Sequence, residues 1–167
     1  MKLYVDCEFT DFIVCELISI ALVGEDAVEF YGEVSDYDVS ACSDFVREVV
    51  LTQLGRLPQC MHTREELRTE LLAWIASLGK REEDVLVCVD SIADWDLIIG
   101  LLGDVPIGWK GVLVGRLVNQ RRREAYFVTK GGRHHALCDA RALRAALPSI
   151  LTGAIAVADM KPSRYSW

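Results

Sequence analysis

The order of apolar and polar positions divides the chain into a strand-rich first third and a mainly helical remainder. The stretches "LYVDCEF" (3–9), "CELISIALVG" (15–24) and "AVEFYGEV" (27–34) are rich in β-branched and aromatic residues and are typical of strands. The short connection "GED" between the second and third stretches favours a hairpin. We therefore expect a three-stranded meander in this part of the chain.

Helical spacing of apolar residues follows, interrupted by one further strand. "EDVLVCVD" (83–90) is a valine-rich run typical of a buried parallel strand. Residues 108–132 show no clear periodicity and could hold a short helix or strand and a mobile loop, and an apolar segment with an exposed end is expected at 154–167. Helices are expected at 43–55, 63–79, 91–103 and 134–151. This order predicts one α/β domain over residues 1–167, with helices flanking a mixed sheet.

Composition narrows the class of protein. Of the 167 residues, 51% are hydrophobic and 26% are charged, and no apolar run approaches the roughly 20 residues that span a bilayer. The chain enters a strand at once, so we expect no signal peptide, no membrane partner and a cytoplasmic location. Six cysteines without a C-x-x-C pair indicate reduced thiols. The net charge of −7 disfavours binding of nucleic acid by bulk charge, but acidic residues that hold cations could still bind phosphate.

Two carboxylates interrupt the first predicted strand. Alternation places Asp6 and Glu8 on the same face as Tyr4, where like charges repel and burial of either charge is costly. Solvated acids on an edge strand would be the ordinary explanation, but the apolar neighbours and the apolar strands that follow disfavour an edge. Because a divalent cation would remove the repulsion, we predict that this pair binds metal.

A second acidic segment begins one of the predicted helices. Asp94 stands three residues after Ser91, which fits a capping box, and it equally fits a carboxylate delivered to the carboxyl end of the sheet. Asp90 and Asp96 are alternatives for the same role.

The third acidic segment, "GGRHHALCDA" (131–140), contains His134, His135 and Asp139. A flexible loop followed by an acid that offsets the helix dipole would be the ordinary explanation. The functional one is a further metal carboxylate, preceded by a histidine that takes a proton near neutral pH. Carboxylates from three separate segments, with a histidine, suit two Mg²⁺ ions in phosphoryl hydrolysis.

These segments resemble the motifs of a known enzyme superfamily. "DCEF" (6–9) resembles the D-x-E of the first exonuclease motif in the DEDD superfamily, and "DSIADWDLI" (90–98) resembles the second motif. "HHALCDA" (134–140) is similar to the third motif of the histidine-type branch, DEDDh, which reads H-x-A-L-x-D-A. The closer resemblance is to small bacterial 3′-5′ exoribonucleases. It implies a ribonuclease-H-like fold with a mixed five-stranded sheet, made of a three-stranded meander and parallel strands, and it implies a homodimer.

The resemblance also implies a role for each acidic residue. Asp6, Glu8 and Asp139 would bind one Mg²⁺, Asp6 would extend to a second, and Asp94 would act through water. His134 would accept the proton from the attacking water, and Mn²⁺ could replace Mg²⁺. The implied reaction shortens single-stranded RNA from its 3′ end and releases nucleoside 5′-monophosphates.

Positive charge is concentrated just before His134, between residues 116 and 133. We predict that this stretch and the two residues after the D-x-E pair bind the nucleic acid, through Phe9, Thr10, Arg121, Arg122, Arg123 and Arg133. The alternative for the basic stretch is a solvated, mobile loop.

The motifs identify a scissile phosphate but not the sugar attached to it. The same chemistry on single-stranded DNA or on short oligonucleotides therefore stays open, as does a phosphoesterase that acts on a small nucleotide. A degenerate module that binds nucleic acid without cutting it is a further alternative, which the presence of all five predicted catalytic residues disfavours.

Overall fold

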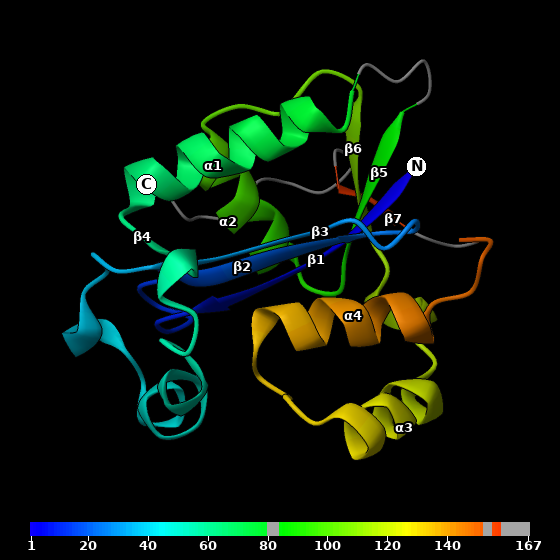
Figure 1. Cartoon of the computed structure of the whole chain (residues 1–167). Coiled ribbons are helices and arrows are strands. Elements are labelled where there is room, and N and C mark those ends of the chain that lie inside the picture. The colour runs from blue at the N-terminus through cyan, green and yellow to red at the C-terminus, as the bar shows by residue number, and fades with distance from the viewer. Residues whose placement is uncertain (80–83, 152–154, 158–167) are drawn as a thin grey trace.

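A single mixed sheet forms the centre of the computed structural model, which describes residues 1–79, 84–151 and 155–157 (Figure 1). β1 to β3 form the predicted antiparallel meander, and β5 and β6 run parallel to β1. In spatial order the strands are β4 (Met61–His62), β3 (Glu29–Val34), β2 (Leu17–Gly24), β1 (Lys2–Phe9), β5 (Val85–Val89), β6 (Trp109–Leu113) and β7 (Ile155–Ala156).

The sequence predicted the long strands and missed the short ones. β1, β2, β3 and β5 lie where the apolar runs placed them, and β6 arises inside the ambiguous segment 108–132. β4 and β7 have two residues each and pair only at the two edges of the sheet, so they carry no readable periodicity. The predicted tail segment contains β7, while residues 154 and 158–167 lie outside the described residues.

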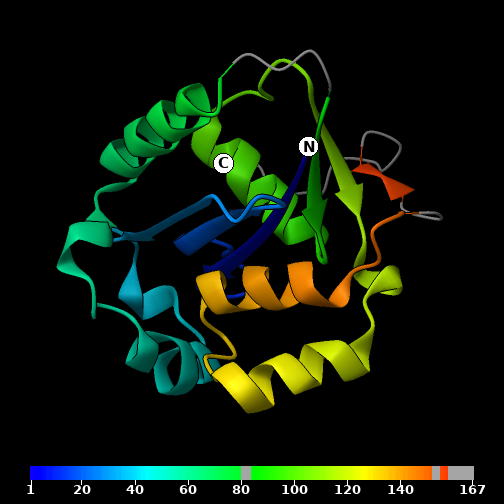
Figure 2. The ribbon, with the colours of Figure 1, turned by 45° about the vertical axis from the view of Figure 1, so that its right-hand side comes forward.

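Helices cover both faces of the sheet (Figures 1 and 2). α1 (Arg64–Ser77) and α2 (Ile92–Leu102) lie on one face, and each begins at a capping box that the sequence predicted. On the other face α4 (Ala136–Ala146) packs directly on β1 and β2, and α3 (Gln120–Lys130) packs against α4. None of the helices in the described part of the chain is long and apolar enough to cross a membrane.

Alternation along β1 decides which face receives the acidic pair. Leu3, Val5 and Cys7 are buried in the main core with the apolar faces of α1 and α2. Tyr4 packs instead with Leu143 of α4 and its neighbours, so Asp6 and Glu8 follow it on the face that α4 covers. β1 pairs with β2 on one side and β5 on the other, and the edge-strand explanation for this acidic pair is therefore wrong.

Two segments differ in detail from the sequence expectation. The helix expected at 43–55 contains a π-helical turn, Val46–Val50, closed by a hydrogen bond from the Leu51 N–H to the Val46 carbonyl, and a 3₁₀ turn at Leu51–Gln53. Within 108–132, where a short helix or strand and a mobile loop were expected, the structure has both a strand, β6, and a helix, α3. α3 begins at Asn119, whose side chain accepts a hydrogen bond from the Arg122 N–H.

Candidate active site

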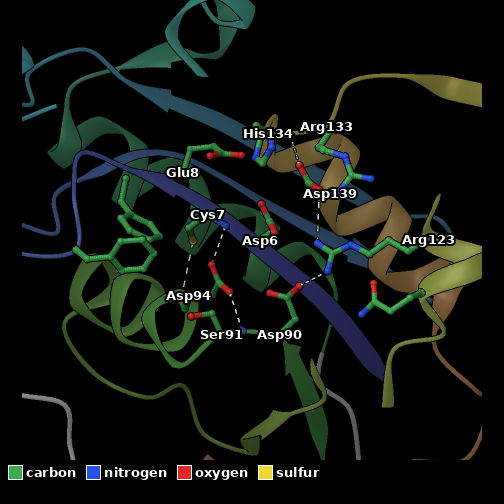
Figure 3. Close-up of a pocket in the computed structure, with 13 residues that line it drawn as sticks. Asp6, Cys7, Glu8, Asp90, Ser91, Asp94, Arg123, Arg133, His134 and Asp139 are labelled. Carbon is green, nitrogen blue, oxygen red and sulfur yellow. Dashed lines mark hydrogen bonds and ion pairs between the residues drawn. The ribbon is translucent and has the colours of Figure 1, made fainter. Parts of the chain in front are cut away.

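A pocket of about 310 Å³ opens where the carboxyl ends of β1 and β5 meet the first turns of α2 and α4 (Figure 3). This is the position in open α/β sheets at which ligands usually bind. Five carboxylates line it, contributed by four separate elements or their ends: Asp6, Glu8, Asp90, Asp94 and Asp139.

Three of these carboxylates are close enough to share one cation. Asp6 and Glu8 project from β1, Asp139 projects from the first turn of α4, and a ligand oxygen from each lies within 4.8 Å of the others. Asp6 and Asp139 are buried, with 9% and 6% of their surface exposed. Clustered carboxylate oxygens are the ligands that Mg²⁺ and Mn²⁺ prefer.

The electrostatics of the cluster favour a bound cation. Burial raises the pKa of Asp6 well above its usual range, and the neighbouring charges of Asp94, Asp139 and Glu8 raise it further. Burial, followed by the charge of Asp139, raises the pKa of Glu8 to about 8. The charged forms of these carboxyls are therefore disfavoured unless protons or cations compensate them, so the residues present fit a divalent metal site.

Asp94 is both a helix cap and a wall of the pocket. Its Oδ2 accepts a hydrogen bond from the Ser91 N–H at 3.2 Å, which completes the capping box, and its Oδ1 accepts one from the Cys7 N–H at 3.1 Å. Burial and the charge of Asp90 raise its pKa well above the usual range, although both hydrogen bonds act in the opposite direction. The two explanations left open by the sequence thus coexist, because the cap is what holds this carboxylate beside β1.

Of the two alternatives to Asp94, one has a different task. Asp90 lines the pocket, but its Oδ2 forms an ion pair with Arg123 at 2.6 Å. Asp96 is not among the residues that line the pocket.

His134 lies at the rim of the pocket and His135 points away from it. His134 has a positive φ of 63°, and its N–H donates to the Asp139 Oδ2 at 2.6 Å. The His135 N–H donates to the same oxygen at 3.2 Å, while its ring stacks on Tyr31 with centroids 4.8 Å apart. The loop thus aims Asp139 and separates the two histidines, as the motif register predicts.

The segment 43–53 holds this histidine loop from the other side. The Gln53 Nε2 donates to the carbonyls of Arg133 and His134 at 2.8 and 3.1 Å. The Phe45 ring meets the imidazole of His134 edge-on, with centroids 4.9 Å apart. Sequence reasoning missed both residues, since Gln53 and the carbonyls it contacts are about 80 positions apart and share no local pattern.

The structure separates the residues predicted to bind nucleic acid. Phe9, Arg123 and Arg133 line the pocket, whereas Arg121 and Arg122 are exposed on α3 outside it. Thr10 does not reach the pocket: it is fully buried, and its hydroxyl bonds the Val14 carbonyl and accepts from the Glu16 N–H. A cavity of about 270 Å³ adjoins the pocket, with a largely aromatic and aliphatic wall that includes Phe9, Phe12, Phe45, Val46 and Val50.

Comparison with known proteins identifies the fold. No protein-family model matches the sequence, and no curated protein sequence matches it. Among solved structures, the chain is similar to cell-death related nuclease 4 (CRN-4), with a TM-score of 0.61 and 15% sequence identity over 86% of this chain. The chain has a ribonuclease-H-like fold. This confirms the fold class predicted from the sequence, although the sheet has seven strands instead of the predicted five. The chain spans only 60% of the length of that nuclease.

Proposed function

We propose that the protein is a metal-dependent 3′-5′ exonuclease of the DEDDh type that shortens single-stranded RNA to nucleoside 5′-monophosphates. The observation that carries the proposal is the convergence of Asp6, Glu8 and Asp139 within 4.8 Å, beside His134, in one pocket. The three sequence motifs contribute these residues in the order that the superfamily resemblance implies. The likeness to a nuclease fold adds support, although at 15% identity it concerns the fold alone.

Each side chain of the pocket has a task in this proposal. Asp6, Glu8 and Asp139 would hold the cations. Asp94 fixes β1 against α2 through the Cys7 N–H and would act on the cations through water. An imidazole nitrogen of His134 accepts the proton of the attacking water, which requires the neutral ring. Two Mg²⁺ ions bound there, or Mn²⁺ in their place, would activate water and stabilise the charge that develops on the phosphate oxygens.

Two aromatic residues beside the acidic cluster support the binding of a single strand. Phe9 and Phe12 lie on the wall shared by the acidic pocket and the aromatic cavity, with their rings 5.1 Å apart. Phe12 is exposed and Phe9 is half-buried, and accessible aromatic rings of this kind stack on unpaired bases. Arg133 also lines the pocket, but its Nη2 donates to both carboxylate oxygens of Glu124 at 2.7 Å, so Glu124 balances much of its charge.

End-labelled RNA and DNA strands, incubated with the protein and Mg²⁺, test the proposal. Stepwise shortening from the 3′ end of single-stranded RNA is the expected result, and Asp6→Asn or Asp139→Asn should reduce the rate at least ~10³-fold. Asp96→Asn is the matched control on α2, outside the pocket, and should retain activity. Faster cleavage of DNA would reassign the substrate, and cleavage restricted to small nucleotides would indicate a phosphoesterase. No turnover with Mg²⁺ or Mn²⁺ would indicate a binding module and overturn the proposal.

The homodimer and the cytoplasmic location are part of the same proposal, since both follow from the sequence and the resemblance. Light scattering coupled to size-exclusion chromatography measures the oligomeric state directly. A molecular mass near twice 18.7 kDa is expected, and a mass near 18.7 kDa would remove the homodimer from the proposal.

A further inference from the structure

Arg123 differs from the two arginines that precede it because its side chain enters the acidic pocket. Arg121 and Arg122 are exposed on α3, whereas the side chain of Arg123 is only 19% exposed. Its guanidinium lies between Asp90 and Asp139 (Figure 3), with Nη1 at 2.6 Å from the Asp90 Oδ2 and Nη2 at 3.6 Å from the Asp139 Oδ1. Arg123 is therefore fixed firmly by one carboxylate and loosely by the other.

The guanidinium retains an unused donor. Arginine carries five N–H donors, and the Nε of Arg123 is buried without a hydrogen-bond partner among the described residues. A buried donor without a partner is costly, so such an atom calls for an explanation. The Nε itself is closed off from solvent, but Nη2 lies 3.6 Å from the Asp139 Oδ1, which is too long for a hydrogen bond. A phosphate oxygen that arrives in the pocket would give Nη2 an acceptor, and phosphate matches the planar fork of a guanidinium.

The two carboxylates that hold Arg123 have different relations to a metal. Asp139 belongs to the cluster of cation ligands, whereas Asp90 does not. A cation bound by Asp139 therefore competes with the weak Arg123–Asp139 contact, while the short Asp90 contact keeps the guanidinium in the pocket. The net charge of the pocket also favours an anion once cations are bound. Two divalent cations together with Arg123 would balance the charges of the five carboxylates, so the pocket could accept an anion.

The geometry points to Arg123 as a phosphate-binding residue that is positioned by Asp90 and that exchanges Asp139 for a phosphate oxygen of the substrate when divalent cations bind. This inference rests on the proposed function, since the phosphate is that of a nucleic acid strand. It separates Arg123 from Arg121 and Arg122, which are exposed on α3 and do not line the pocket.

The first test measures the affinity of the protein for Mn²⁺ alone. Arg123→Met removes a positive charge beside Asp139 and should tighten Mn²⁺ binding several-fold. Asp90→Asn removes a carboxylate and frees Arg123 to pair with Asp139, so it should weaken Mn²⁺ binding several-fold. Arg64→Met, at the start of α1 on the opposite face of the sheet, should change it little. Weaker Mn²⁺ binding by a folded Arg123→Met would overturn the inference.

The second test compares a nucleoside 5′-monophosphate with its parent nucleoside in the presence of Mn²⁺. The ratio of the two affinities isolates the phosphate, and it should fall about tenfold or more in Arg123→Met because a charge-assisted hydrogen bond is lost. Asp90→Asn should lower the same ratio, and Arg64→Met should not. Equal ratios in the wild type and Arg123→Met would overturn the inference. If the wild type cleaves no nucleic acid, the proposed function is refuted instead. The comparison of Mn²⁺ affinities does not depend on nuclease activity and can still be made.

Discussion

Two adjacent residues, His134 and His135, have different surroundings in the folded chain. His134 faces the pocket from a left-handed backbone conformation, and His135 is turned onto Tyr31. Burial lowers the pKa of His135, and its Nδ1 is buried without a partner among the described residues. The two neighbouring positions therefore differ in their surroundings: His134 lines the pocket, and His135 packs on Tyr31.

We predict opposite consequences for the two alanine variants. His134→Ala should abolish cleavage, since no other imidazole lines the pocket in the described part of the chain, and it should leave the melting temperature nearly unchanged. His135→Ala should retain most activity but lose about 1 kcal/mol of stability with the stacking on Tyr31. Activity assays and thermal unfolding of both variants provide the check, and the reverse pattern would show that the motif register is shifted by one residue.

Among the elements, the segment 43–53 supports the site through hydrogen bonds and a ring contact with the histidine loop. Gln53 holds the carbonyls of Arg133 and His134, and both the N–H of His134 and that of His135 are held by Asp139. A residue with a positive φ needs such support, because that backbone conformation is unfavourable for side chains with a Cβ.

Gln53→Met should therefore lower kcat about tenfold and leave KM nearly unchanged, because the variant keeps the side-chain volume but loses both hydrogen bonds. Steady-state kinetics well below the melting temperature measure the effect. Gln59→Met, an exposed glutamine outside the pocket, serves as the matched control. An equal kcat in Gln53→Met and Gln59→Met would mean that Gln53 does not support the histidine loop.

α3 provides a second prediction at this scale. Arg121 and Arg122 are exposed on the element that forms one side of the pocket, and each phosphate contact with a single strand contributes about 0.7 to the salt dependence of log K. Replacing both by alanine should lower the magnitude of that slope by up to about 1.4, as measured by RNA binding across a salt series. Arg64→Ala, at the start of α1 on the opposite face of the sheet, is the control, and an unchanged slope in the double variant would remove α3 from the binding surface.

For the whole molecule, the acidic cluster links folding to protons and cations. The pKa of Glu8 is raised from 4.5 to about 8, so the folded state binds this proton more tightly than the unfolded state does. The contribution of Glu8 to stability is therefore present below pH 4.5 and is lost as the pH rises towards 8. His135 contributes to the pH dependence of stability with the opposite sign, because burial lowers its pKa. The part of the pH dependence that is due to Glu8 is therefore obtained by comparing the wild type with a Glu8 variant.

Without metal, the wild type should lose more stability than Glu8→Gln between pH 5 and pH 8.5. Mn²⁺ should reverse the difference, because cations bind the ionised carboxylates and stabilise the folded state more strongly as the pH rises. Thermal unfolding in EDTA and in Mn²⁺ across this range tests both statements. Asp6→Asn should lose most of the Mn²⁺-dependent rise in melting temperature, and an equal rise in wild type and variant would place the cation elsewhere.

Much of the fold could be predicted from patterns of residues that are close together in the sequence. Helix caps at Thr63 and Ser91, and the long apolar strands, depend on residues a few positions apart, and the structure confirms them. The segment 108–132 was ambiguous because its helix, α3, is highly polar and buries little apolar surface, so its periodicity is weak.

The sequence was enough to predict the acidic pair of β1, two further carboxylates that begin helices, and the mixed sheet that carries them, since spacing within a few residues encodes each. The folded structure was needed to show that Arg123 binds Asp90 across 33 positions, that Gln53 supports the histidine loop across 80, and that Thr10 is buried. The physical reason is that such contacts depend on where the folded chain brings distant segments together. The local pattern of apolar and polar residues within a segment does not indicate which distant segment it will contact.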